Sequence, residues 1–169
     1  MLLKDTKKPF IPAPEGLHQA VCVDFIDLGE METPWGKKPK CRIYWQVDAL
    51  NPENNERFLV TNTYTASLNE KANLRHHLEA WRGRKFTEKE LQGFDTEQLI
   101  GANCQIQVIH VQSKKDPAQK FANIQAIVPI GRNTTKLAPE NYVRVKDRVG
   151  QNGEEAAAPA EDAEDVVPF

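Results

Sequence analysis

The chain has 169 residues, of which 40% are hydrophobic and 27% are charged, a composition that suits one globular domain with appendages. It lacks an apolar run of membrane-spanning or signal-peptide type, and its three widely spaced cysteines exclude a disulfide scaffold and a CxxC-type zinc site. These features predict a cytoplasmic protein. The net charge of −2 hides an asymmetry, because six acids and no Lys or Arg follow Gly150 and leave residues 1–150 with 22 bases against 18 acids.

Prolines in the first fourteen residues predict an extended N-terminal arm over residues 1–15. From Gly16 apolar and polar residues alternate, which predicts a strand. Residues 29–39 read as a loop, because two prolines and a glycine break the pattern there. Four more strands are predicted, two before and two after a helical region. They begin near residues 41, 57, 105 and 120 and end near residues 48, 66, 112 and 129.

Three apolar residues between the third and fourth strands recur at helical spacing, so they share one face and predict a helix that Gly83 ends. They are Leu74, Leu78 and Trp81. The candidates for the N-cap of this helix are Ser67 and Asn69. Thr87, followed by Glu90, predicts a second capped turn of helix, and residues 95–100 predict a third.

The resulting order, β-β-β-α-β-β, is that of the OB-fold, a small Greek-key barrel. We therefore predict an all-β fold over residues 16–130, a five-stranded OB-fold barrel with one inserted helix. A five-stranded SH3-like barrel and a plain β-meander with an inserted helix are the competing interpretations. Residues 131–150 carry five bases against two acids and predict a basic connector, in which Val143 and Val145 form a short strand in the alternative interpretation. Residues 151–169, rich in Ala, Pro and acids, predict a disordered acidic tail.

The chain ends in a short apolar tip behind these acids. The tip consists of Asp165, Val166, Val167, Pro168 and Phe169. The Phe169 ring suits an apolar pocket on a partner, and its terminal carboxylate suits a basic side chain beside that pocket. Acids upstream steer such a tail toward basic partners. The pattern favours a docking peptide over a tail that serves solubility alone.

An acidic tail with a Pro-Phe tip resembles that of single-stranded-DNA-binding proteins of the bacterial and bacteriophage kind, with Val167 where Ile is usual. Segments 64–68, 73–75 and 81–87 are also similar to the phage branch of this class. The resemblance implies an OB-fold that binds single-stranded DNA and a tip that recruits replication or repair proteins. For a phage protein it also implies the cytoplasm of a bacterial host. The tail is shorter than in the housekeeping bacterial protein, which favours a monomer or dimer over its homotetramer.

Binding single strands without sequence preference needs aromatic faces for the bases and a basic groove for the phosphates. An OB-fold usually presents both on its second and third strands and on the loops joining strands 1–2 and 4–5. Trp35 in the first of these loops is a stacking candidate, unless it folds back over the barrel mouth. The predicted phosphate contacts are Lys37, Lys38, Lys40, Arg42, Lys114, Lys115 and Lys120.

Three further aromatic residues are stacking candidates: Tyr44, Tyr64 and Phe121. The apolar sets of the second and fifth strands are expected to point inward, which turns Tyr44, Arg42 and Phe121 outward. These sets are Cys41, Ile43, Trp45 and Val47, and Ala122, Ile124, Ala126 and Val128. A register shifted by one residue would instead make Trp45 the ligand. Tyr64 suits either the core or the DNA-binding surface.

An enzyme is not predicted, and neither a metal nor a cofactor is expected. The acids are scattered, and His76 and His77 point about 100° apart on a helix, which does not suit one metal ion. Phosphate-binding and nucleophile motifs are absent from the sequence. We predict stoichiometric coating of single-stranded DNA during replication, recombination or repair. The alternatives are an RNA-binding OB-fold, a tail-mediated protein adaptor and a ring-forming recombination annealing protein.

Overall fold

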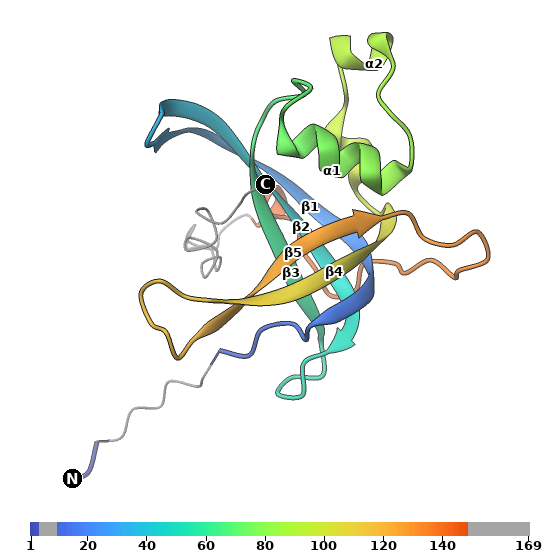
Figure 1. Ribbon diagram of the computed structural model, residues 1–169. Helices are drawn as coiled ribbons and strands as arrows, with labels where there is room; N and C mark the ends of the chain where they lie inside the picture. The colour runs from blue at the N-terminus through green and yellow to red at the C-terminus, as the bar shows by residue number, and fades with distance from the viewer. Residues whose placement is uncertain (4–9, 149–169) are drawn as a thin grey trace.

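The computed structural model describes residues 1–3 and 10–148. Its strands form one antiparallel sheet in the spatial order β3-β2-β1-β4-β5 (Figure 1). Along the chain, the helical segments α1, α2 and η1 come between β3 and β4. The elements are β1 (Gly16–Thr33), β2 (Gly36–Leu50), β3 (Arg57–Thr65), α1 (Asn73–Arg82), α2 (Glu88–Gln92), η1 (Thr96–Leu99), β4 (Asn103–Gln112), β5 (Lys120–Val128) and η2 (Val145–Asp147).

The strand order confirms the predicted mostly-β class and excludes one alternative. β1 lies between β2 and β4, whereas a plain meander would follow the order of the chain. The sheet is open in the described residues, with β3 and β5 at its two edges. These edge strands nevertheless contact each other, and α1 contacts β3, β4 and β5. None of the described helices is long and apolar enough to cross a membrane.

The main core lies between α1 and one face of the sheet, which we call the inner face. It contains the inward set predicted for the second strand, and the ring centroids of Trp45 in β2 and Trp81 in α1 are 5.7 Å apart. The three cysteines, Cys22, Cys41 and Cys104, are buried and unpaired. Burial raises the pKa of Cys22 and that of Cys41 to about 12, so both thiols stay protonated and pack as small apolar groups.

Helical signals in the sequence were mostly accurate. The apolar face of α1 is buried, and the helix ends at Gly83 with a left-handed φ of 75°. Thr87 and Glu90 form the expected capping box, and Asp95 caps η1. The predicted N-cap of α1 is wrong, because the side chains of Ser67 and Asn69 accept hydrogen bonds from backbone amides two residues ahead and close turns before the helix begins.

The capping box leads to a testable dependence on pH. Glu90 accepts a hydrogen bond from Arg82 at 2.6 Å and one from the Thr87 amide at 3.0 Å, and these bonds, chiefly that from Arg82, lower its pKa from 4.5 to about 2. A carboxyl whose folded pKa is depressed stabilises the fold above its unfolded pKa, and the effect is lost as pH falls through the folded value.

We therefore expect Glu90→Gln to lower the melting temperature near neutral pH. The difference from the unmodified chain should shrink as pH falls from about 4.5 toward about 2. Thermal unfolding of both proteins over this range measures it. A difference that stays constant across the range would show that the charge of Glu90 does not stabilise the fold.

The sheet departs from the predicted pattern in β5. Its pairing with β4 shifts by one residue at Gln125, a β-bulge that reverses the alternation beyond it. Ile124, before the bulge, lies in the core as predicted. Beyond it Ile127 is 2% exposed, whereas Val128, predicted inside, is 40% exposed.

The predicted loop over residues 29–39 is also wrong. β1 and β2 continue as a two-stranded ribbon up to the pair Thr33 and Gly36, and this ribbon extends beyond the end of β3 (the blue and teal hairpin at the upper left of Figure 1). Pro39 is tolerated because its carbonyl accepts from Ala66, on the side away from β1, so its nitrogen also faces away from the β1 ladder. From here on we call residues 29–40 the arm, which is separate from the N-terminal arm predicted over residues 1–15.

Candidate nucleic-acid interface

The arm separates its charges onto two faces. In an antiparallel ribbon directly opposed residues share a face, and successive residues alternate between faces. Within residues 29–40, one face carries Lys38 and Lys40 and no acid. The other face carries Glu30, Glu32 and Lys37, and Lys37 lies directly opposite Glu32. Of the predicted phosphate contacts in the arm, Lys37 is therefore on a face shared with acids.

The face with Lys38 and Lys40 continues onto β2 and β3. Lys40 Nζ donates to Thr65 Oγ1 at 3.1 Å, and Arg42 Nε donates to Thr63 Oγ1 at 2.9 Å. Both pairs are cross-strand neighbours. Cationic side chains neutralise phosphates, and each threonine hydroxyl keeps its own proton to donate to a phosphate oxygen. We call these five residues, Lys38, Lys40, Arg42, Thr63 and Thr65, the basic track.

Trp35 lies at the tip of the arm and is 83% exposed. The Thr33 hydroxyl donates to the Gly36 carbonyl at 2.6 Å and accepts from the Trp35 amide at 3.2 Å, so the turn is braced from within. Gly36 adopts a φ of 99°, which a side chain would strain. Trp35 therefore projects from the arm instead of folding back over the sheet, which leaves its ring available for stacking.

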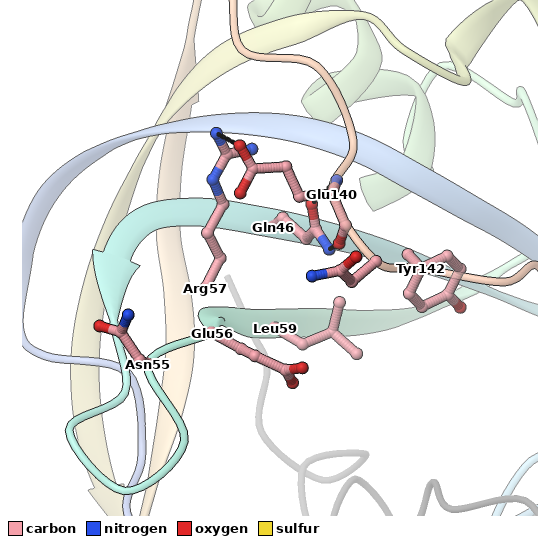
Figure 2. Close-up of a pocket in the computed structure, with 8 residues that line it drawn as sticks. Gln46, Asn55, Glu56, Arg57, Leu59, Glu140 and Tyr142 are labelled. Carbon is pink, nitrogen blue, oxygen red and sulfur yellow. Dashed lines mark hydrogen bonds and ion pairs between the residues drawn. The ribbon is translucent and has the colours of Figure 1, made fainter.

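The chain after β5 returns across the face of the sheet opposite the inner face, which we call the outer face. We call residues 137–148 the strap. Two side-chain amides hold the strap with paired hydrogen bonds like those between strands. Each amide accepts from the backbone N–H and donates to the backbone C=O of one strap residue: Asn103 pairs with Leu137, and Gln46 pairs with Glu140. Arg57 adds bonds to Ala138 O at 2.7 Å and to Glu140 at 3.0 Å. Figure 2 shows Gln46, Arg57 and Glu140 around a shallow cavity of about 160 Å³.

Asp24, in the middle of β1, is the main anchor of the strap. It is 2% exposed, and its Oδ2 accepts from the Tyr142 hydroxyl and from the Val145 amide, both at 2.9 Å. Its Oδ1 accepts from Arg144 Nε at 3.2 Å and from the Phe25 amide at 2.9 Å. A buried carboxylate with four donors is well satisfied, whereas the same carboxylate without the strap would lose three of them.

Arg144 also binds Glu97 through two bonds of 2.7 and 2.9 Å. These bonds to Glu97 raise the pKa of Arg144 and lower the pKa of Glu97, so both groups stay charged. Burial and the bond to Asp24 raise the pKa of Tyr142, which keeps its hydroxyl as a donor. Residues 145–147 form the short helix η2, where a strand at Val143 and Val145 had been the alternative.

The strap covers Tyr44. This residue faces away from the main core, as predicted, but its ring lies 6.5 Å from the Tyr142 ring and it is only 5% exposed. The Arg148 guanidinium lies 5.4 Å from the Tyr142 ring. Arg42 is 8% exposed, so Lys38 and Lys40 are the more accessible cations of the basic track. Trp45 is fully buried in the main core, which excludes the shifted register.

The other two predicted stacking residues are also covered. Tyr64 lies in the main core, where its hydroxyl is 2.6 Å from His77 Nδ1 and burial raises its pKa. Of its two open interpretations, the core is the observed one. Phe121, predicted to point outward, is 9% exposed because Phe10 packs on it with ring centroids 5.9 Å apart. Neither residue presents a free face to a base in this structure.

The remaining predicted cations lie elsewhere. Lys114, Lys115 and Lys120 are exposed at the connection between β4 and β5, which Figure 1 draws at the lower left, away from the arm. The structure therefore does not bring them together with the basic track. The tip residues Asp165, Val166, Val167, Pro168 and Phe169 lie outside the described residues.

Sequence reasoning missed the strap and its anchor. One signal was present, because Asp24 is a lone acid in the apolar run Val-Cys-Val-Asp-Phe-Ile and such a group needs partners if the strand is buried. In the described residues, no group of three or more His, Cys, Asp or Glu side chains is placed to hold a metal ion. No protein-family model and no curated protein matches the chain.

Proposed function

We propose that this chain binds single-stranded DNA without sequence preference, and that its sheet is an OB-fold barrel opened at one seam. In that fold the strands close in the ring order 1-2-3-5-4, and the observed order β3-β2-β1-β4-β5 is the same ring cut between β3 and β5. The contact between these two edge strands supports this interpretation. The OB-fold is a recurrent scaffold for single-stranded nucleic acids.

The observation that carries the proposal is the one-sided basic track that leads to Trp35. Phosphate binding needs cations without nearby acids, and Lys38 and Lys40 meet that condition while the acids of the arm lie on its other face. Base binding needs an exposed aromatic ring, and Trp35 supplies one. The two requirements are met on one arm, with the cations on one of its faces and the exposed ring at its tip.

The acidic tip at residues 165–169 completes the proposal. We assign the sheet and arm to coating and protecting transient single strands, and the tip to recruiting replication or repair proteins. The tip suits this role by its composition, an apolar Pro-Phe end behind a cluster of acids. Binding of the open strand alone shifts hairpins toward the open form.

Intrinsic fluorescence tests the proposal directly. The other two tryptophans, Trp45 and Trp81, are 0% and 5% exposed, so quenching by an oligonucleotide reports on Trp35. We expect strong quenching by oligothymidine and little by a duplex of the same length. Trp35→Ala should weaken binding, measured by anisotropy of a labelled oligonucleotide, by about 5- to 150-fold, since one stacked base is worth about 1–3 kcal/mol.

Leu50→Ala is the matched control, because Leu50 is 51% exposed at the opposite end of β2. It should bind like the unmodified chain. RNA of the same length belongs in the series, since stacking alone does not separate ribose from deoxyribose. Absence of quenching together with absence of a gel shift would refute DNA coating and favour a tail-mediated adaptor.

A further inference from the structure

The position of Trp35 at the end of the arm limits what its ring can stack on. The basic track is bounded on one side by the strap, which covers Tyr44. On the other side it ends at the tip, since Glu30 and Glu32 occupy the opposite face of the arm and repel phosphates there. A strand held on the track therefore leaves the protein at Trp35.

The backbone turn that carries the ring at this exit is braced. The Thr33 hydroxyl donates to the Gly36 carbonyl and accepts from the Trp35 amide, and the Trp35 ring is 83% exposed. Of the other aromatic residues considered for stacking, Tyr44, Tyr64 and Phe121 are at most 9% exposed. An exposed ring at the end of a track meets the final base of the bound segment on one face only, unlike a ring within a groove, which is flanked by successive bases.

The flat end of a duplex suits such a ring better than one mobile base, because it is larger and already ordered. We propose that Trp35 caps the terminal base pair where bound single-stranded DNA becomes duplex, so that the protein prefers single-strand to double-strand junctions over free single strands. This inference rests on the proposed function, because it requires the single strand to lie on the basic track.

Two labelled oligonucleotides test it with the full chain. Both carry the same single-stranded segment, which is free in one and continues into a hairpin duplex in the other, with the duplex placed at the 5′ or the 3′ side in separate versions. 2-Aminopurine at the terminal base pair reports stacking. We expect one junction polarity to bind about five- to tenfold more tightly than the free strand and to change 2-aminopurine fluorescence, since a stacking contact at the lower end of its usual range has about this effect.

Two variants separate the capping role from general binding. Trp35→Ala should bring the ratio of junction to single-strand affinity close to one and abolish the 2-aminopurine change. Lys38→Ala should weaken both oligonucleotides equally and preserve the ratio, because it removes a phosphate contact shared by both. Both residues are exposed, so neither change should affect folding.

Each other outcome has a definite meaning. A ratio of one in the unmodified chain, with Trp35 quenched equally by both oligonucleotides, overturns junction capping and leaves single-strand binding intact. Failure to bind either oligonucleotide overturns the proposed function itself. Quenching of Trp35 by phosphatidylserine vesicles and not by oligonucleotides overturns both in favour of a membrane surface.

Discussion

Replacing Asp24 by alanine is expected to lower the free energy of unfolding by about 3–5 kcal/mol, the loss typical when one partner of a buried charged pair is removed. The carboxylate accepts three hydrogen bonds from the strap, from Tyr142, Arg144 and Val145. Its removal leaves these donors without their acceptor at a site that is 2% exposed. Urea-induced unfolding, followed by the fluorescence of the buried tryptophans, measures the change.

Asp27→Ala provides a control three residues along the same strand. Asp27 is exposed and accepts one hydrogen bond, from the Gly29 amide at 2.8 Å. A loss below about 1.5 kcal/mol is expected there, the upper range for a single hydrogen bond. Equal losses for the two variants would mean that Asp24 does not anchor the strap.

Features that depend on neighbours in the chain were predictable from the sequence. The buried face of α1, its end at Gly83 and the capping box of Thr87 and Glu90 all follow from side chains within one or two turns of each other. The alternation in β2 also held, because β2 pairs with β3 without a shift from residue 40 to residue 46. Hydrophobic periodicity and capping rules suffice to predict such elements where no distant segment of the chain alters the local structure.

Features that depend on distant segments were not predictable in this way. Two prolines and a glycine indicated a loop at residues 29–39, but two facing strands extended through them as a ribbon. The bulge at Gln125 reversed the faces at the end of β5 although the sequence alternates regularly. In the strap, Asp24 bonds residues more than 115 positions further along the chain. Patterns of neighbouring residues in the sequence cannot predict such a contact.

Two of the three covered stacking candidates, Phe121 and Tyr44, are covered in the same way. Residues from the two ends of the described chain each bring a ring onto the sheet, Phe10 onto Phe121 and Tyr142 onto Tyr44. Each ring covers a residue that the sequence had offered as a stacking candidate. Among the stacking candidates, the exposed ring is therefore Trp35 on the arm and not a residue on the sheet. The candidate interface is consequently narrower than the predicted set and centred on Trp35, Lys38 and Lys40.

The structure distinguishes two adjacent lysines, Lys37 and Lys38, that the sequence had predicted to be equivalent phosphate contacts. Lys38 lies on the acid-free face of the arm, and Lys37 lies opposite Glu32 on the other face. Alanine at either position removes one positive charge at nearly the same place, so the long-range field changes equally. A difference in DNA affinity between Lys38→Ala and Lys37→Ala therefore reports direct phosphate contact.

We expect Lys38→Ala to weaken binding of oligothymidine about tenfold at low salt, the effect of losing a hydrogen bond to a charged group. The slope of log affinity against log salt should fall by about 0.7, because one fewer phosphate is neutralised on a single strand. Lys37→Ala should leave the slope unchanged and weaken binding less than about threefold. Anisotropy titrations at several salt concentrations measure both quantities. Equal effects of the two changes would show that binding responds to net charge alone, and the face-specific basic track would then have no role.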